Sequence, residues 1–105
     1  MSYQSDLNRA AGLITGLIKS TIQNKGLVDT GKLLNSISTT VSINSETGAF
    51  QIKVSGEDYF EYLDNKFNIV DDAFASSAFA SIEEILNTAY MSFLEDKINT
   101  DQIKN

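Results

Sequence analysis

The stretch Gly26–Ile37, which reads GLVDTGKLLNSI, decides how the rest of the chain folds. Asp29–Gly31 has the composition of a tight turn, with side-chain oxygens that can cap a helical turn and a glycine that can adopt positive φ. Leu33 and Leu34 then direct that helical turn toward a core. From Ser36 the pattern changes to alternation. The stretch is therefore expected to end one helix, turn the chain and begin a sheet. The residues assigned to this structural turn are Asp29, Thr30, Gly31, Leu34, Ser36 and Ile37.

Residues 2–25, which precede this stretch, repeat apolar side chains every three or four positions, and this spacing predicts an amphipathic helix. The repeating residues are Leu7, Ala10, Ala11, Ile14, Leu17, Ile18, Thr21 and Ile22. Gly26 follows the last of them and suits a helix C-cap. On the opposite face, Gly12 and Gly16 each lower the stability of the helix by roughly 1 kcal/mol relative to alanine. Either another backbone approaches them closely, as in a subunit contact, or the helix tolerates them.

A β-hairpin is expected after the turn. Residues 37–43 and 50–55 each alternate apolar and polar side chains, and residues 44–48 have turn composition. Both strands are apolar on one face only. The sheet should therefore have one covered face and one face open to solvent or a partner.

Residues 57–67 combine acids with aromatics, and their pattern fits either a short helix or a third strand. Six acids between Glu57 and Asp72 stand beside the single Lys66. Their spacing does not match a calcium-binding loop, so a solvated acidic face is the simplest interpretation.

The last long helix is predicted over residues 73–94, with Asp71 and Asp72 as caps and negative charge at its N-terminus. Its apolar stripe should pack on the sheet. The polar tail 95–105 is expected to fray. The chain is therefore predicted to be a single α+β domain, residues 1–105, in which a helix, a capped turn and a hairpin precede the long C-terminal helix.

Composition excludes most catalytic chemistry. With no histidine and no cysteine among 105 residues, the usual general base and the commonest metal ligands are missing. Asp29–Gly31 matches the Asp-Thr-Gly triplet of aspartic proteases, but Lys32 follows it and no flap or bracing motif appears. The net charge of −6 disfavours binding to nucleic-acid phosphates, and no signal peptide or membrane span is predicted. The expectation is a protein without enzymatic activity or cofactors.

Val28–Ile37 resembles the V-D-T-G-x-L-x-x-S-I block of the phage tail-completion (head-to-tail joining) proteins of long-tailed bacteriophages. In that family a helix precedes the block, a hairpin follows it and a helix ends the chain. Tyr59–Asp64 resembles the opening of the family's next segment, Y-x-x-Y. The Gly-Thr that closes this segment is absent, and Asn68–Phe74 stands where the family has a proline-containing stretch.

The resemblance implies a structural virion protein that forms a homo-oligomeric ring in the phage neck. A head-connector protein and a tail protein would be its neighbours, and DNA would pass through the channel without specific binding. A tail-terminator ring is one alternative. Another is an acidic DNA mimic that blocks a host nuclease, suggested by the net charge and the acidic segment.

A head-to-tail ring needs two different, complementary patches on each subunit. The best-matched pair of patches combines a basic, glycine-containing helix face with the acidic segment. The candidate interface residues are Arg9, Gly12, Gly16 and Lys19 on the first patch, and Glu57, Asp58, Glu61 and Asp64 on the second. If these patches do not meet, the acidic segment is expected to face the DNA channel.

Overall fold

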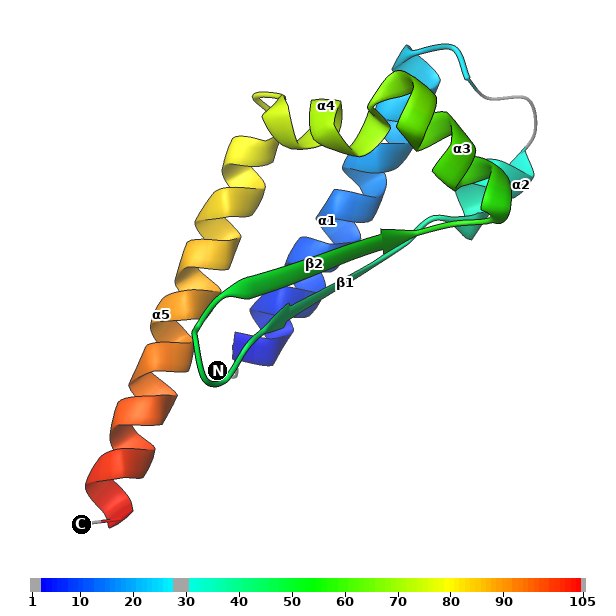
Figure 1. Ribbon diagram of the computed structural model, residues 1–105. Coiled ribbons are helices and arrows are strands. Elements are labelled where there is room, and N and C mark those ends of the chain that lie inside the picture. The colour runs from blue at the N-terminus through cyan, green and yellow to red at the C-terminus, as the bar shows by residue number, and fades with distance from the viewer. Residues whose placement is uncertain (1–2, 28–30, 105) are drawn as a thin grey trace.

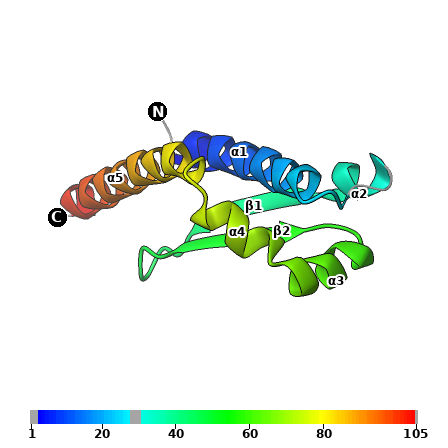
Figure 2. The ribbon, with the colours of Figure 1, turned by 90° about the horizontal axis from the view of Figure 1, so that it is seen from above.

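The computed structural model describes residues 3–27 and 31–104, with side chains up to Lys97, and has the predicted α+β architecture. Helices α1 and α5 form one layer, and the hairpin with α3 and α4 forms the other (Figures 1 and 2). The elements in chain order are α1 (Tyr3–Asn24), α2 (Gly31–Ser36), β1 (Ser38–Ile43), β2 (Phe50–Ser55), α3 (Asp58–Phe67), α4 (Ile69–Ala75) and α5 (Phe79–Lys104).

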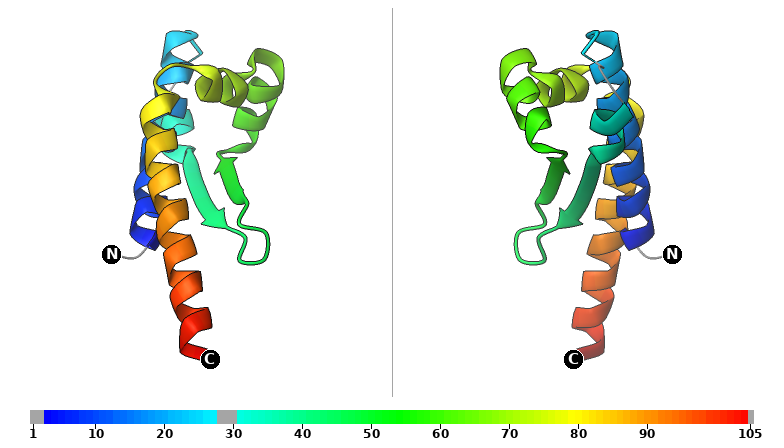
Figure 3. Two further views of the ribbon diagram at one scale, coloured as in Figure 1. Left: turned by 90° about the vertical axis from the view of Figure 1, so that its left-hand side faces the viewer. Right: turned by 90° about the vertical axis from the view of Figure 1, so that its right-hand side faces the viewer.

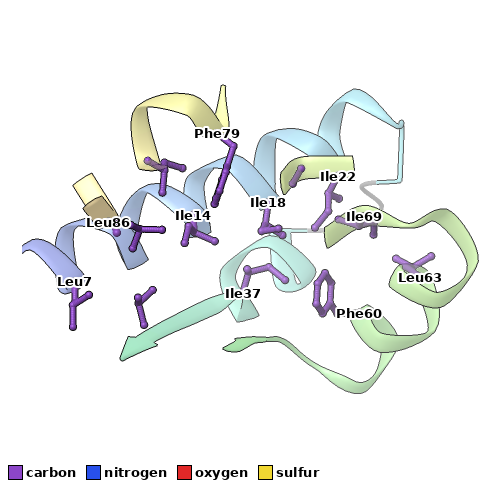
Figure 4. Packing of buried hydrophobic residues seen from close by; sticks show 14 of the residues in the cluster. Leu7, Ile14, Ile18, Ile22, Ile37, Phe60, Leu63, Ile69, Phe79 and Leu86 are labelled. Atoms are coloured by element: carbon purple, nitrogen blue, oxygen red, sulfur yellow. The ribbon is translucent and has the colours of Figure 1, made fainter. Parts of the chain in front are cut away.

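Helix α1 is the central element of the core, and its predicted apolar stripe is confirmed. The side chains at its buried face, Leu7, Ala10, Ile14, Ile18 and Ile22, are at most 1% exposed. They pack against residues from the hairpin, α3, α4 and α5 (Figure 4). The predicted C-cap is also confirmed, because Gly26 has φ +71° and the N–H of Leu27 donates to the carbonyl of Ile22 at 3.2 Å.

Strands β1 and β2 form the predicted antiparallel hairpin, with Val41 opposite Ile52 on the apolar face. This face lies on α1, where the Thr15 hydroxyl donates to the Thr39 hydroxyl at 2.8 Å. In the connecting turn, the side-chain oxygen of Asn44 accepts hydrogen bonds from two following backbone N–H groups, and Gly48 has φ +75°. Within the described residues the sheet has two strands.

The segment that fitted either a helix or a third strand is a helix. Helix α3 buries Phe60 and Leu63 and exposes Asp58 and Glu61, so its periodicity is that of an amphipathic helix. Its C-cap, Asn68, adopts the left-handed conformation and directs the chain into α4.

The long C-terminal helix is confirmed as α5, but its predicted start at residue 73 is wrong, because the chain forms two helices, α4 and α5, that are separated at Ser76. Ser76 is extended, with φ −75° and ψ 155°, and its hydroxyl donates to the carbonyl of Ala73 at 2.7 Å. A serine hydroxyl competes with helical hydrogen bonding in this way. Phe74 and Phe79 stack across the break with ring centroids 4.8 Å apart, so the apolar pattern continues although the helix does not.

Asp71 and Asp72 were expected to cap that long helix, and this placement is also wrong. They lie in the first turn of α4, whose N-cap is Asn68. Their negative charge still lies near a helix N-terminus. Asp72 also pairs with Lys25 at the end of α1, with 2.5 Å between the charged atoms.

Helix α5 continues to Lys104, ten residues beyond the predicted end at Leu94. Residues 95–104 contain no proline or glycine that would stop the helix. Helix α5 packs on α1 and meets the hairpin through Tyr90, whose ring centroid lies 6.2 Å from that of Phe50. Its C-terminal end projects beyond the other elements, so the molecule is elongated (Figure 3).

Candidate subunit interface

Ser36 and Ile37, the last two residues of the predicted turn motif, connect the end of α2 to the start of α3. The Ser36 hydroxyl accepts a hydrogen bond from the backbone N–H of Glu57 at 3.1 Å and donates to the carbonyl of Leu33 at 2.7 Å. Ile37 is buried beside Gly56, where an added Cβ would lie only 2.9 Å from the Ile37 Cδ1. The end of α2 and the start of α3 therefore hold each other in place.

The remaining predictions for this motif have different outcomes. Asp29 and Thr30 lie outside the described residues. Gly31 is the first residue of α2, so the expectation that it adopts positive φ in a turn is wrong. Leu33 is buried and Leu34 is half-buried, which confirms that this helical turn faces the core.

The four predicted acids lie around one pocket between β2, α3 and α4. Glu57, Asp58, Glu61 and Asp64 line it together with Val54, Phe60 and Val70, and its volume is about 310 Å³. The pocket thus combines an acidic rim with apolar side chains. Among the described residues no group of acids is arranged to hold a metal ion.

Two of these acids also have structural partners. The Asp64 side chain accepts a hydrogen bond from the backbone N–H of Val70 at 2.8 Å and so satisfies a free donor at the start of α4. Glu57 lies 3.9 Å from the exposed Lys32 amine. Asp58 and Glu61 are exposed and have no ion-pair or hydrogen-bond partner in the described part of the chain.

The predicted basic patch is an open surface on α1. Arg9, Gly12 and Gly16 are exposed and Lys19 is half-buried. A Cβ added at either glycine would meet nothing within 4 Å, so packing within this chain does not require them. Within residues 3–27 and 31–97, neither Arg9 nor Lys19 has an ion-pair or hydrogen-bond partner.

An exposed aromatic pair on α3 was not predicted from the sequence. Tyr59 and Tyr62 are 48% and 55% exposed, and their rings stack with centroids 5.8 Å apart and planes inclined by 16°. The buried face of α3 consists of Phe60 and Leu63. The three-residue spacing of the tyrosines, followed by Lys66 over the Tyr62 ring, is the signal that could have revealed this pair.

Comparison of the chain with protein-family models, curated proteins and solved structures finds no match. In the described residues, no helix combines the length and the apolar character that crossing a membrane requires.

Proposed function

We propose that this chain is a non-enzymatic structural protein that forms a homo-oligomeric ring in the neck of a long-tailed bacteriophage and joins the head connector to the tail. The observation that carries the proposal is the resemblance of Val28–Ile37 to the tail-completion block, in a chain whose elements follow the family's order of helix, block, hairpin and helix. The hydrogen bonds of Ser36 give the last part of this block a role in holding the fold.

The surface chemistry supports a head-to-tail ring. Such a ring buries two different patches of each subunit, one against each neighbour. On the open face of α1, Arg9 and Lys19 have no ion-pair or hydrogen-bond partner among the described residues. Asp58 and Glu61 on α3 have none there either. Opposite charges on two separate surfaces favour contact between unlike patches of neighbouring copies and disfavour contact between like patches.

The net charge of −6 suits a ring through which DNA passes. A surface that repels phosphates releases no counterions and forms no lasting contact with the duplex. In the proposed neck, a connector protein on the head side and a tail protein on the other side would be the neighbours of the ring.

Disruption of the gene in a phage that carries it tests the proposed role. With an early stop codon, DNA-filled heads and complete tails should accumulate separately, and adding the purified chain should join them. Electron microscopy of the lysate provides the measurement. Joined, infectious particles in the absence of the chain would contradict the proposal, whereas normal heads with tails of uncontrolled length would favour a tail terminator.

A further inference from the structure

We propose that Tyr59 and Tyr62 on α3 of one copy pack onto the Gly12 to Gly16 face of α1 in the next copy. This inference rests on the ring proposed above and names the side chains that supply the apolar centre of its interface.

The aromatic pair is a prominent surface feature without a role in the described fold. Both rings are about half exposed, while Phe60 and Leu63 of the same helix are at most 5% exposed. Tyrosines are enriched at protein interfaces because they offer a large apolar area and a polar tip at low cost in conformational entropy. The amphipathic pattern of α3 therefore accounts for its buried face and leaves the tyrosine face unexplained.

The glycine face of α1 has a matching shape. Gly12 and Gly16 lie one turn apart, about 6 Å along the axis, and the two tyrosine centroids are 5.8 Å apart. Without side chains at these positions, two flat rings can approach the α1 backbone closely. Leu13, which is 44% exposed beside the glycines, adds apolar area to the surface that receives them.

The charges around the two surfaces select a second copy in head-to-tail orientation. Asp58 and Glu61 flank Tyr62 on the exposed half of α3, and Arg9 and Lys19 flank the glycines on α1. Contact between two α1 faces would bring Arg9 and Lys19 of one copy toward the same bases of the other, whereas α3 carries Lys66 over the Tyr62 ring as well as its acids. The unlike pairing brings Asp58 and Glu61 toward Arg9 and Lys19, and it leaves a free patch on each end for the next subunit.

Cross-linking between two single-cysteine variants tests the contact directly, because the chain has no cysteine of its own. Leu13→Cys labels the α1 face and Asn65→Cys labels α3 one turn beyond Tyr62, so both tyrosines and both glycines remain. Equal amounts of the two variants, mixed and treated with a short bis-maleimide, should yield a dimer containing one of each. The matched control replaces Asn65→Cys with Glu84→Cys on the exposed side of α5, and it should yield no dimer.

The mass of the native assembly, measured on the same samples, separates the two proposals. A ring with the cross-link supports both. A ring without the cross-link overturns the tyrosine contact and leaves the ring in place. A chain that stays monomeric and is not cross-linked overturns both.

Removal of the two tyrosine side chains gives a second test of the contact. Tyr59→Ala with Tyr62→Ala should raise the concentration at which half the chain is assembled by about tenfold or more, while the thermal unfolding of the monomer stays close to that of the parent. Met91→Ala on α5 is the control, since Met91 is equally exposed at 57%. Equal effects of the double variant and the control on assembly would contradict the inference.

Discussion

The hydroxyl of Ser36 lies 3.1 Å from the backbone nitrogen of Glu57 and accepts its hydrogen bond, although the two residues are 21 positions apart. This contact joins the last residue of α2 to the N-cap of α3 across the base of the hairpin. The same hydroxyl donates to the carbonyl of Leu33, so one side chain satisfies a donor and an acceptor at two helix ends. The serine of the block that resembles the tail-completion family therefore has a structural role in this chain.

Ser36→Ala should destabilise the fold, because it leaves the partly buried N–H of Glu57 without its acceptor. We expect a loss of about 1 to 2 kcal/mol in the free energy of unfolding, measured by urea denaturation. Ser20→Ala is the control, because Ser20 is exposed on α1 and alanine favours the helix. A Ser36→Ala variant as stable as this control would show that the hydrogen bond contributes nothing.

Two glycine-to-alanine changes should have opposite effects. At Gly56 the new Cβ would lie 2.9 Å from Ile37 and 3.1 Å from Phe60, so overpacking should cost about 1 to 3 kcal/mol. At Gly12 the new Cβ meets nothing, and higher helix propensity should add up to about 1 kcal/mol. Thermal unfolding of the two variants under conditions that favour the monomer measures the difference. The same sign for both would contradict the packing described at Gly56.

Ile82→Ala should be the more damaging of two truncations on α5. Ile82 is 3% exposed, and its loss should cost about 2 to 5 kcal/mol through lost burial and the cavity that remains. Met91 is 57% exposed on the same helix, so Met91→Ala should change stability by less than about 0.5 kcal/mol. Similar unfolding midpoints for the two variants would mean that α5 does not pack on α1 as described.

Salt should loosen the proposed ring without abolishing it. Exposed ion pairs contribute about 0 to 1 kcal/mol each to stability. The Debye length, over which charges are screened, falls from about 10 Å at 0.1 M to about 3 Å at 1 M salt. Sedimentation velocity should therefore show rings in both buffers, with a higher assembly concentration at 1 M. Complete dissociation at high salt would show that charge, and not apolar packing, holds the subunits together.

Gly12→Leu combined with Gly16→Leu should harm assembly more than salt does. Both positions are open within the chain, so the monomer should fold, but two leucine side chains would block close approach of a neighbour. Circular dichroism checks the fold and sedimentation checks the assembly. A double variant that folds and still forms rings would exclude this face from the interface.

Periodicity predicted the elements whose two faces differ in polarity. The stripe of α1 and the alternation of β1 and β2 are confirmed because one face of each element is covered more fully than the other: α1 buries its stripe, and the apolar side chains of the strands are buried or half-buried. The break at Ser76 was missed because Phe74 and Phe79 continue the apolar pattern across it. Its cause is a local competition between a hydroxyl and the helical backbone, which periodicity does not detect.

The candidate interface was predictable only in part. Glu57, Asp58, Glu61 and Asp64 are clustered along the sequence, and the structure places them around one pocket, while their role in a subunit interface stays a prediction. The sequence did not reveal that Asp64 satisfies the start of α4, since this depends on the left-handed turn at Asn68. It also did not show which aromatics of α3 are exposed, because that depends on how α3 packs against its neighbours.

A density map of the neck of an intact virion tests the central claim most directly. We expect a closed ring between the head connector and the tail, with the fold of α1, the hairpin and α5 in every subunit and α3 of each copy against α1 of the next. Finding the chain elsewhere in the particle, or not finding it there, would overturn the proposed role.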